Sequence, residues 1–383
     1  MRILFTTWPA HGHLLPMLPL IRTAQRAGHE IVVASGREGV AEAQRRSLPT
    51  WNVGPSRAEA NAAFRLLVPD LGMIPPAERL PTVVSGVFGA AAARRIVELL
   101  PLTDQWRPDL VVHPITELAG AVVAARTGAR HVVHGLGPLP VEAWEWFGSR
   151  FGDLCRDWDV PDLTEHILDR VYLDNCPPML QADAVNDFRN RRALRPTSGE
   201  VLPGEGLPWA EDVLAALPYE HTVHLTLGTL FNGATEVFVT ALAGLRQLPV
   251  NVLVTVGPGA DPHCLGPQPD HVLVTDFAPH ALLLPRCDAL VTQGGAGTIV
   301  AALCHGLPHL ILPQGADQFH NAATAERAGM ALVLPPPQFT PDTVTTAVDQ
   351  LLKDPALRQR CRAAQGEIAT MPDEDAVLAT LTA

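Results

Sequence analysis

The residues best suited to chemistry in this chain form a glycine-rich run, Gln293-Gly294-Gly295-Ala296-Gly297-Thr298. The run lies between a short apolar segment at 289–291 and another that begins near Ile299, which predicts a strand, a loop and a helix. Glycines at such a junction let the backbone approach a phosphate, and the helix N-terminus offers unpaired N–H groups and partial positive charge. We therefore expect a diphosphate to bind at Gly294, Gly295, Gly297 and Thr298.

A second loop of the same kind follows shortly afterwards. Residues 309–312 have the composition of a strand, 313–316 form the loop, and Asp317-Gln318 lead into another helix. A carboxylate beside an amide suits sugar hydroxyls, which both donate and accept hydrogen bonds. The two loops together predict a nucleotide-sugar site, with the diphosphate on the first loop and the sugar on the second.

Composition limits the classes of protein to consider. With 383 residues the chain has room for two domains of about 150–200 residues each. Its net charge of −12 argues against nucleic acid as a partner. It has no run of 18 apolar residues, so we expect no membrane-spanning helix. The apolar stretch at 3–5 is too short for the core of a signal peptide, so we expect a strand there instead. With six scattered cysteines and no CxxC pattern, we expect a cytoplasmic protein with reduced thiols and no membrane contact.

Apolar runs alternate with helical stretches in both halves of the chain. The expected strands lie at 2–7, 31–34, 110–113 and 131–134, and then at 221–227, 251–256, 271–274, 289–291, 309–312 and 331–334. Residues 66–101 have a helical pattern, and 141–195 show no clear strand, so we expect helices there. This rhythm predicts an α/β fold with two doubly wound parallel sheets.

Four motifs, in the right order, resemble one family. They are MRILFTTWPAHGHLLPMLPL at 1–20, DLVVHPITELAGAVVAARTG at 109–128, LTLGT at 225–229 and the long segment 276–321. They resemble nucleotide-sugar-dependent glycosyltransferases of the GT-B fold, and among these the bacterial enzymes that add deoxysugars to natural products, kin to the plant secondary-metabolite glucosyltransferases. The resemblance implies two facing Rossmann-like domains with a cleft between them. We expect an acceptor domain at 1–200, a proline- and glycine-rich linker at 201–219, a donor domain at 220–365, and residues 366–383 returning toward the first domain.

The resemblance assigns the chemistry to His13, in the turn Gly12-His13-Leu14-Leu15-Pro16. In the family a histidine here is the general base of an inverting transfer, for which a hydroxyl acceptor must lose its proton. Many members orient it with an aspartate at the position of Pro114, so this chain departs from the pattern. We expect Glu117 to replace that aspartate; the alternative for Glu117 is a carboxylate that complements a helix N-terminus. His11 is the histidine most easily confused with the base.

The resemblance also assigns the nucleotide contacts. Gln293 stands where the family usually has a histidine that donates to the diphosphate. Thr229, in the loop after the expected strand 221–227, is expected to contact the phosphates as well. Phe277 is expected to stack on the base, and the backbone of Ala278 to pair with its edge. Plant relatives bind the ribose hydroxyls through a glutamate at the position of Ala301, so this chain favours dTDP over UDP.

The sequence gives weaker signals for the residues that contact the acceptor and for a metal site. Besides His11, we expect Trp144 and Phe147 to contact the acceptor, although these aromatics could equally belong to a helix core. Asp157-Trp158-Asp159 matches a DxD metal motif but follows no expected strand, so we expect no metal and no cofactor beyond the sugar nucleotide.

The resulting hypothesis is a metal-independent hexosyltransferase that moves a deoxysugar from dTDP to a hydrophobic natural product. Two alternatives stay open: a non-catalytic homologue that binds nucleotide sugars as the partner of another enzyme, and a nucleotide-sugar epimerase. Neither the sugar, the acceptor nor the attacking atom follows from the sequence, and a homodimer stays open beside a monomer.

Overall fold

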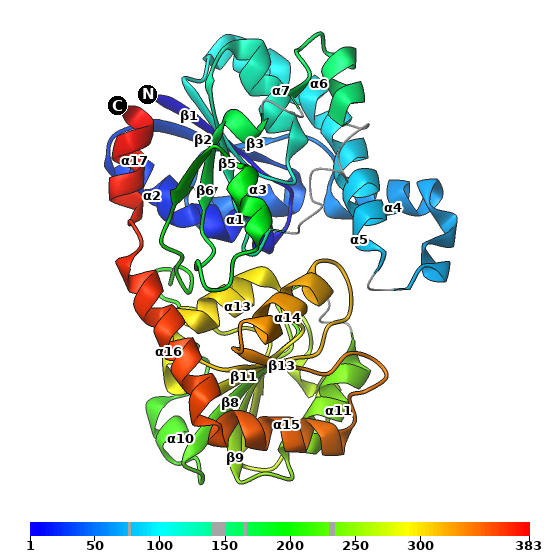
Figure 1. Ribbon diagram of the computed structural model, residues 1–383, viewed down its shortest axis with the longest axis vertical. Coiled ribbons are helices and arrows are strands. Elements are labelled where there is room, and N and C mark those ends of the chain that lie inside the picture. The colour runs from blue at the N-terminus through cyan, green and yellow to red at the C-terminus, as the bar shows by residue number, and fades with distance from the viewer. Residues whose placement is uncertain (76–77, 140–150, 164–166, 230–233) are drawn as a thin grey trace. The chain divides into compact units, whose positions relative to one another are not determined.

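The computed structural model describes residues 1–75, 78–139, 151–163, 167–229 and 234–383. The chain divides into two compact units (Figure 1). Unit 1 comprises Met1–Cys176, Gln181–Arg195 and Met371–Ala383, and unit 2 comprises Pro177–Leu180 and Pro196–Thr370. Each unit is built on its own parallel sheet and is described by itself.

Unit 1 contains a seven-stranded parallel sheet in the order β3-β2-β1-β4-β5-β6-β7. Its strands are β1 (Arg2–Thr6), β2 (Glu30–Ser35), β3 (Thr50–Asn52), β4 (Leu110–Pro114), β5 (Arg130–His134), β6 (Val171–Asp174) and β7 (Asn190–Ala193). Strand β1 pairs with β2 on one side and β4 on the other. Because the loops after β1 and β4 leave adjacent strands at the carboxyl edge, where the strand order reverses, their side chains can meet there.

Helices cover both faces of this sheet. They include α1 (His11–Leu14), α2 (Leu18–Arg26), α3 (Arg37–Arg45), α4 (Arg57–Leu67), α5 (Leu80–Val83), α6 (Gly89–Trp106), α7 (Leu118–Thr127) and α17 (Glu374–Thr382). A π-helical turn at Val84–Phe88 leads into α6. The C-terminal helix α17 packs on α2, with Val377, Leu378 and Leu381 in the same buried cluster as Leu18 and Ile21.

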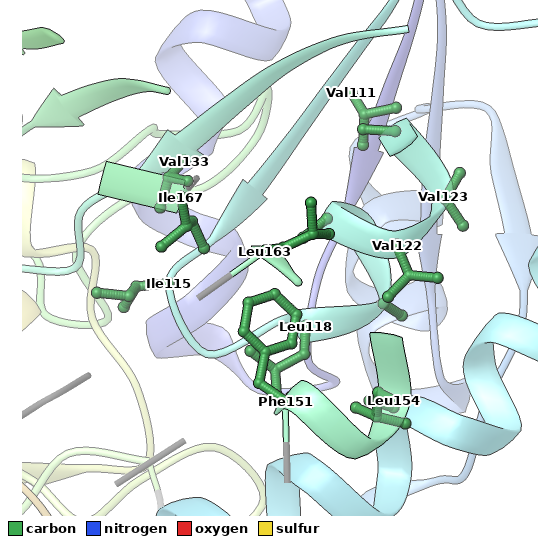
Figure 2. Close-up of a cluster of buried hydrophobic side chains, with 14 of the residues drawn as sticks. Val111, Ile115, Leu118, Val122, Val123, Val133, Phe151, Leu154, Leu163 and Ile167 are labelled. Atoms are coloured by element: carbon green, nitrogen blue, oxygen red, sulfur yellow. The ribbon is translucent and has the colours of Figure 1, made fainter. Parts of the chain in front are cut away.

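A buried apolar cluster links α7 with its surroundings in unit 1 (Figure 2). Strands β4 and β5 contribute Val111 and Val133, α7 contributes Leu118 and Val122, and Phe151 packs with them. Ile115, in the loop between β4 and α7, also belongs to this cluster. The loop is therefore anchored in the core at both of its ends.

Unit 2 contains a six-stranded parallel sheet in the order β10-β9-β8-β11-β12-β13. Its strands are β8 (His221–Thr226), β9 (Val250–Thr255), β10 (Val272–Thr275), β11 (Ala289–Thr292), β12 (His309–Ile311) and β13 (Ala331–Val333). Its helices are α10 (Glu211–Ala215), α11 (Thr235–Leu245), α12 (His280–Leu283), α13 (Ala296–Leu303), α14 (Gln318–Arg327), α15 (Pro341–Lys353) and α16 (Pro355–Thr370). Strand order reverses at β8 and β11, so the loops after these strands meet at the carboxyl edge.

The α/β fold with two doubly wound parallel sheets is confirmed, and every expected strand is present within two residues at either end. The expectation of helices without strands at 141–195 was wrong, because β6 and β7 lie in that interval. Both are short, and β7 is an arginine-rich edge strand without the apolar pattern of a buried strand.

The unit boundaries differ in detail from the expected ones. Unit 2 begins at Pro196, and part of the expected linker packs on its core through Leu207, Trp209, Leu214 and Leu217. Helix α16 belongs to unit 2, and the return to unit 1 begins at Met371. Within the described ranges, no helix is both long and apolar enough to cross a membrane.

Candidate functional site

His13 is positioned by the short helix α1, which follows β1 directly. Nδ1 of its half-buried ring lies 2.8 Å from Oγ1 of Thr116, in the loop between β4 and α7. The ring also packs against Phe88, with centroids 5.6 Å apart. Among the described residues Thr116 is the hydrogen-bond partner of this ring, so Nδ1 is held and Nε2 is left for another partner.

The surroundings keep the His13 ring neutral. Removal from water and, to a smaller extent, the positive charge of Arg95 lower the pKa of His13 to about 4. At neutral pH the imidazole therefore has a lone pair on one nitrogen, as a general base requires.

The structure places Glu117 differently from the expectation that it orients His13. Its carboxylate forms a buried ion pair with Arg95 of α6 and accepts a hydrogen bond from the Ala119 backbone at 3.2 Å, which caps α7. Both partners of the ion pair are 1% exposed. Burial raises the pKa of Glu117, while Arg95 and the Ala119 amide oppose that shift. Among the described residues, the side chain that hydrogen-bonds to His13 is the neighbouring Thr116, and Glu117 is a helix cap.

Arg95 connects the ion pair to an aromatic group. Its guanidinium carbon lies 5.7 Å from the ring centroid of Trp8, and Trp8 meets Phe88 edge to face at 5.0 Å. A side chain at Gly54 would bring its Cβ within 2.8 Å of Arg95 Nε, so glycine is needed there. The positive charge of Arg95 is therefore held near His13 among buried side chains.

His11 has a different partner. Its Nε2 lies 3.5 Å from a carboxylate oxygen of Glu42, on α3. Although burial alone would raise the pKa of Glu42, the hydrogen bond with His11 and the charges of Arg46 and Arg45 hold it at about 2. His11 is therefore the histidine of this turn that has a carboxylate partner, and a test of the general base must include it.

The glycine run forms the loop between β11 and α13, as expected. Gly294 has φ +93°, and a Cβ there would lie 2.6 Å from Ile311 Cγ2, so glycine is required for both reasons. The backbone N–H of Thr298 donates to the carbonyl oxygen of Gly295 at 3.0 Å. The N–H groups of Ala296 and Gly297 are the first of α13 and have no partner among the described residues, and Gly297 is exposed. These donors and the positive end of the helix dipole suit a phosphate.

Gln293 is buried and its amide is held in one orientation. Oε1 accepts a hydrogen bond from the hydroxyl of Thr292 at 2.8 Å, and that hydroxyl also accepts from Gly294 N at 3.4 Å. Nε2 lies beside both Gly228 and Gly295: a Cβ added to these residues would be 2.3 Å and 3.0 Å from it. The amide therefore directs its donors between the loop after β8 and the glycine loop. Thr229 follows Gly228 and is half-buried.

Asp317 and Gln318 begin α14 beside the glycine loop. Asp317 Oδ2 accepts a hydrogen bond from Asn321 Nδ2 at 2.8 Å, and the same nitrogen donates to the Gly294 carbonyl at 3.0 Å. Burial raises the pKa of Asp317, and the bond from Asn321 lowers it. Gln318 is buried, and its Oε1 accepts from the backbone N–H groups of Gln314 and Gly315. Gln318 thus supports its own loop.

The remaining predicted residues are described by their exposure to solvent. Phe277 is 44% exposed, as a stacking ring must be, and Ala278 is buried. Trp144 and Phe147 lie outside the described residues. Asp157 and Asp159 are exposed, and no group of three or more potential metal ligands occurs in the described part of the chain.

Sequence reasoning missed five residues of these two sites. They are Phe88, Arg95 and Thr116 around His13, and Thr292 and Asn321 around the glycine loop. Thr292 and Asn321 lie within the glycosyltransferase-like segment, and that proximity was the available signal. Phe88 and Arg95 carry no local pattern that separates them from ordinary helix residues.

Comparisons with known proteins agree across the whole chain. The family described as erythromycin biosynthesis protein CIII-like matches residues 22–228 with its N-terminal domain and 239–383 with its C-terminal domain. The elloramycin glycosyltransferase ElmGT of Streptomyces olivaceus is 30% identical over 394 residues, covering 100% of this chain and 97% of that protein. The L-demethylnoviosyl transferase of Streptomyces niveus is 31% identical, covering 88% of this chain and 85% of that protein.

Solved structures show the same fold. The spinosyn rhamnosyltransferase SpnG complexed with thymidine diphosphate matches with a TM-score of 0.81 at 24% identity, covering 100% of both chains. The same enzyme complexed with spinosyn aglycone matches with a TM-score of 0.80. The fold is that of GT-B glycosyltransferases with two Rossmann-like domains. This chain belongs to the family of erythromycin biosynthesis protein CIII-like glycosyltransferases.

Proposed function

We propose that this protein is an inverting, metal-independent hexosyltransferase that moves a deoxysugar from dTDP to a hydrophobic natural-product acceptor, with His13 as general base. The observation that carries the proposal is the geometry of His13, whose Nδ1 lies 2.8 Å from Thr116 while the ring has a pKa of about 4. A neutral imidazole held at one nitrogen has the other nitrogen available for a substrate proton.

The transfer balances with these groups. His13 Nε2 takes the proton of the acceptor hydroxyl as its oxygen forms a bond to the anomeric carbon. The bond from that carbon to the diphosphate oxygen breaks, and dTDP leaves with the electron pair. Backbone N–H groups of Ala296 and Gly297, the oriented amide of Gln293 and the dipole of α13 suit the negative charge that develops on the leaving group. These donors are the reason that we propose no metal.

The choice of dTDP rests on the ribose side of the site. Ala301 is buried in the same apolar cluster as Ala278, so this position offers no carboxylate for a ribose 2′-hydroxyl. The solved structure of the spinosyn rhamnosyltransferase complexed with thymidine diphosphate supports the same donor class for this chain. The names of two relatives, an elloramycin glycosyltransferase and an L-demethylnoviosyl transferase, support a natural-product acceptor and a deoxysugar donor.

The experiment compares His13→Ala with His11→Ala. Turnover is measured as acceptor-dependent dTDP release from a panel of dTDP-deoxysugars, and dTDP binding is measured by calorimetry in EDTA. His13→Ala should lower turnover by about 10²–10⁴ and leave the dTDP affinity unchanged. His11→Ala should cost much less, and wild-type turnover should rise with pH through about 4, because only neutral imidazole accepts a proton.

Each result has a definite reading. Full activity in His13→Ala would reject His13 as the base, and loss confined to His11→Ala would transfer the role to the His11–Glu42 pair. Tight dTDP binding without turnover on any donor would favour a non-catalytic homologue. Loss of dTDP binding in EDTA would reject the metal-independent reaction.

A further inference from the structure

The loop between β4 and α7 is rigid on both sides of Thr116. Ile115 is buried in the apolar cluster of Figure 2, and its N–H donates to the His134 carbonyl at 3.3 Å. The N–H of Glu117 donates to the Pro114 carbonyl at 2.9 Å, and the Glu117 side chain is held by Arg95. The direction of the Thr116 side chain is therefore set by its neighbours.

The Thr116 hydroxyl is not needed to cap α7. A threonine at this position often accepts a hydrogen bond from the first turn of the following helix. Here Glu117 is the N-cap and its carboxylate accepts from the Ala119 backbone. Among the described residues, the contact of the Thr116 side chain is with His13 Nδ1, 103 positions away in the sequence.

Resting on the proposed role of His13, we propose that Thr116 is its positioning residue: its hydroxyl accepts Nδ1–H and so leaves the lone pair of Nε2 to take the acceptor proton. A threonine oxygen can accept from Nδ1–H and thus select the tautomer that a base requires. Unlike a carboxylate, it adds no negative charge to stabilise the imidazolium. The nearby charge is the positive one of Arg95, which agrees with a ring that is neutral at rest.

Thr116→Val tests this role, because valine has nearly the same shape and lacks only the hydroxyl. Thr116→Ser keeps the hydroxyl. Thr127→Val is the matched control, since the Thr127 hydroxyl donates to the Val123 and Ala124 carbonyls within α7. Nitrogen-15 NMR of labelled histidine, assigned through His13→Ala, reports the tautomer of His13 without any need for activity. Steady-state kinetics with a dTDP-sugar give kcat and KM.

We expect wild-type His13 to carry its proton on Nδ1, and Thr116→Val to lose that preference. The kcat of Thr116→Val should fall about ten- to hundredfold, because the hydrogen bond from Nδ1–H becomes one from a charged imidazolium as the proton is taken. The donor KM should be unchanged. Thr116→Ser should restore both the tautomer and kcat, and Thr127→Val should match wild type. An Nε2–H tautomer in the wild type, or an unaltered kcat in Thr116→Val while His13→Ala is inactive, would overturn the positioning role. A fully active His13→Ala would overturn the proposed base and this inference together.

Discussion

At the scale of single residues, the carboxylate of Asp317 has two functions to separate. The sequence predicts that it accepts hydrogen bonds from a sugar. In the structure it accepts one from Asn321, whose amide also donates to the Gly294 carbonyl. Asn321 is 1% exposed, and its amide donates both of these bonds within the protein. A substitution of Asn321 is therefore the control for a substitution of Asp317.

We expect Asp317→Ala to weaken the dTDP-sugar about ten- to hundredfold, because a hydrogen bond to a charged group is lost. Free dTDP should lose little affinity, since it has no sugar for Asp317 to contact. Asn321→Ala should weaken both ligands alike, because it releases the glycine loop that both use. Calorimetry with the two ligands checks this, and equal losses in Asp317→Ala would give Asp317 the same supporting role as Asn321.

At the scale of elements, Gly294 in the loop before α13 and Gly297 in its first turn differ in their need for glycine. Gly294 has φ +93° and no room for a Cβ, whereas a Cβ at Gly297 would meet nothing within 4 Å. The first glycine is therefore needed by the fold. The space beside the second is available to a ligand.

Gly297→Ala should fold with equal or greater stability, because alanine favours a helix by about 1 kcal/mol over glycine. Its dTDP affinity should fall at least about tenfold, or 1.4 kcal/mol, because the added methyl group lies where a phosphate would approach the helix. Gly294→Ala should lower the free energy of unfolding by about 1–2 kcal/mol from the backbone alone. Thermal unfolding without ligand and dTDP calorimetry measure both effects. Undiminished dTDP binding in Gly297→Ala would remove the diphosphate from this helix end.

At the scale of the whole molecule, buried histidines connect stability to pH. Burial is the main cause that lowers the pKa of at least seven of them to about 3 or 4: His13, His113, His134, His224, His280, His309 and His320. In the unfolded chain a histidine titrates near 6.5. Between pH 6.5 and 4 the unfolded state therefore binds more protons than the folded state.

We expect the free energy of unfolding to be largest above about pH 6.5 and to fall as the pH drops toward 4, with uptake of several protons on unfolding. Glu42, with a pKa of about 2, loses its contribution only at lower pH. The buried carboxyls Glu117, Asp174 and Asp317 have raised pKa values and act in the opposite sense, but the histidines outnumber them. Urea unfolding at pH 8, 6 and 5 measures the trend. Equal stability at all three would show that these histidines are hydrated in the folded protein.

The sequence by itself determined the sheets and the donor loop. Parallel strands that are buried on both faces contain continuous apolar runs, so β1, β4 and β11 can be recognised from their own residues. The glycine run is equally local, because a strand, a turn with φ above zero and a helix follow one another within a few residues. Strands β3, β6 and β7 were missed because they have only three or four residues each, and pairing with neighbouring strands rather than composition makes them strands.

Only the tertiary structure decided which side chains meet. Glu117 was expected to orient His13 because a carboxylate commonly does so and it lies near the right strand end. Its choice of partner depends instead on Arg95, which α6 places beside it from 22 positions away and which, once buried, requires a negative charge. Because Glu117 is paired with Arg95, the hydrogen-bond partner of His13 is Thr116, which is 103 positions away in the sequence. Such contacts are set by the packing of distant elements, and no local pattern of residues encodes them.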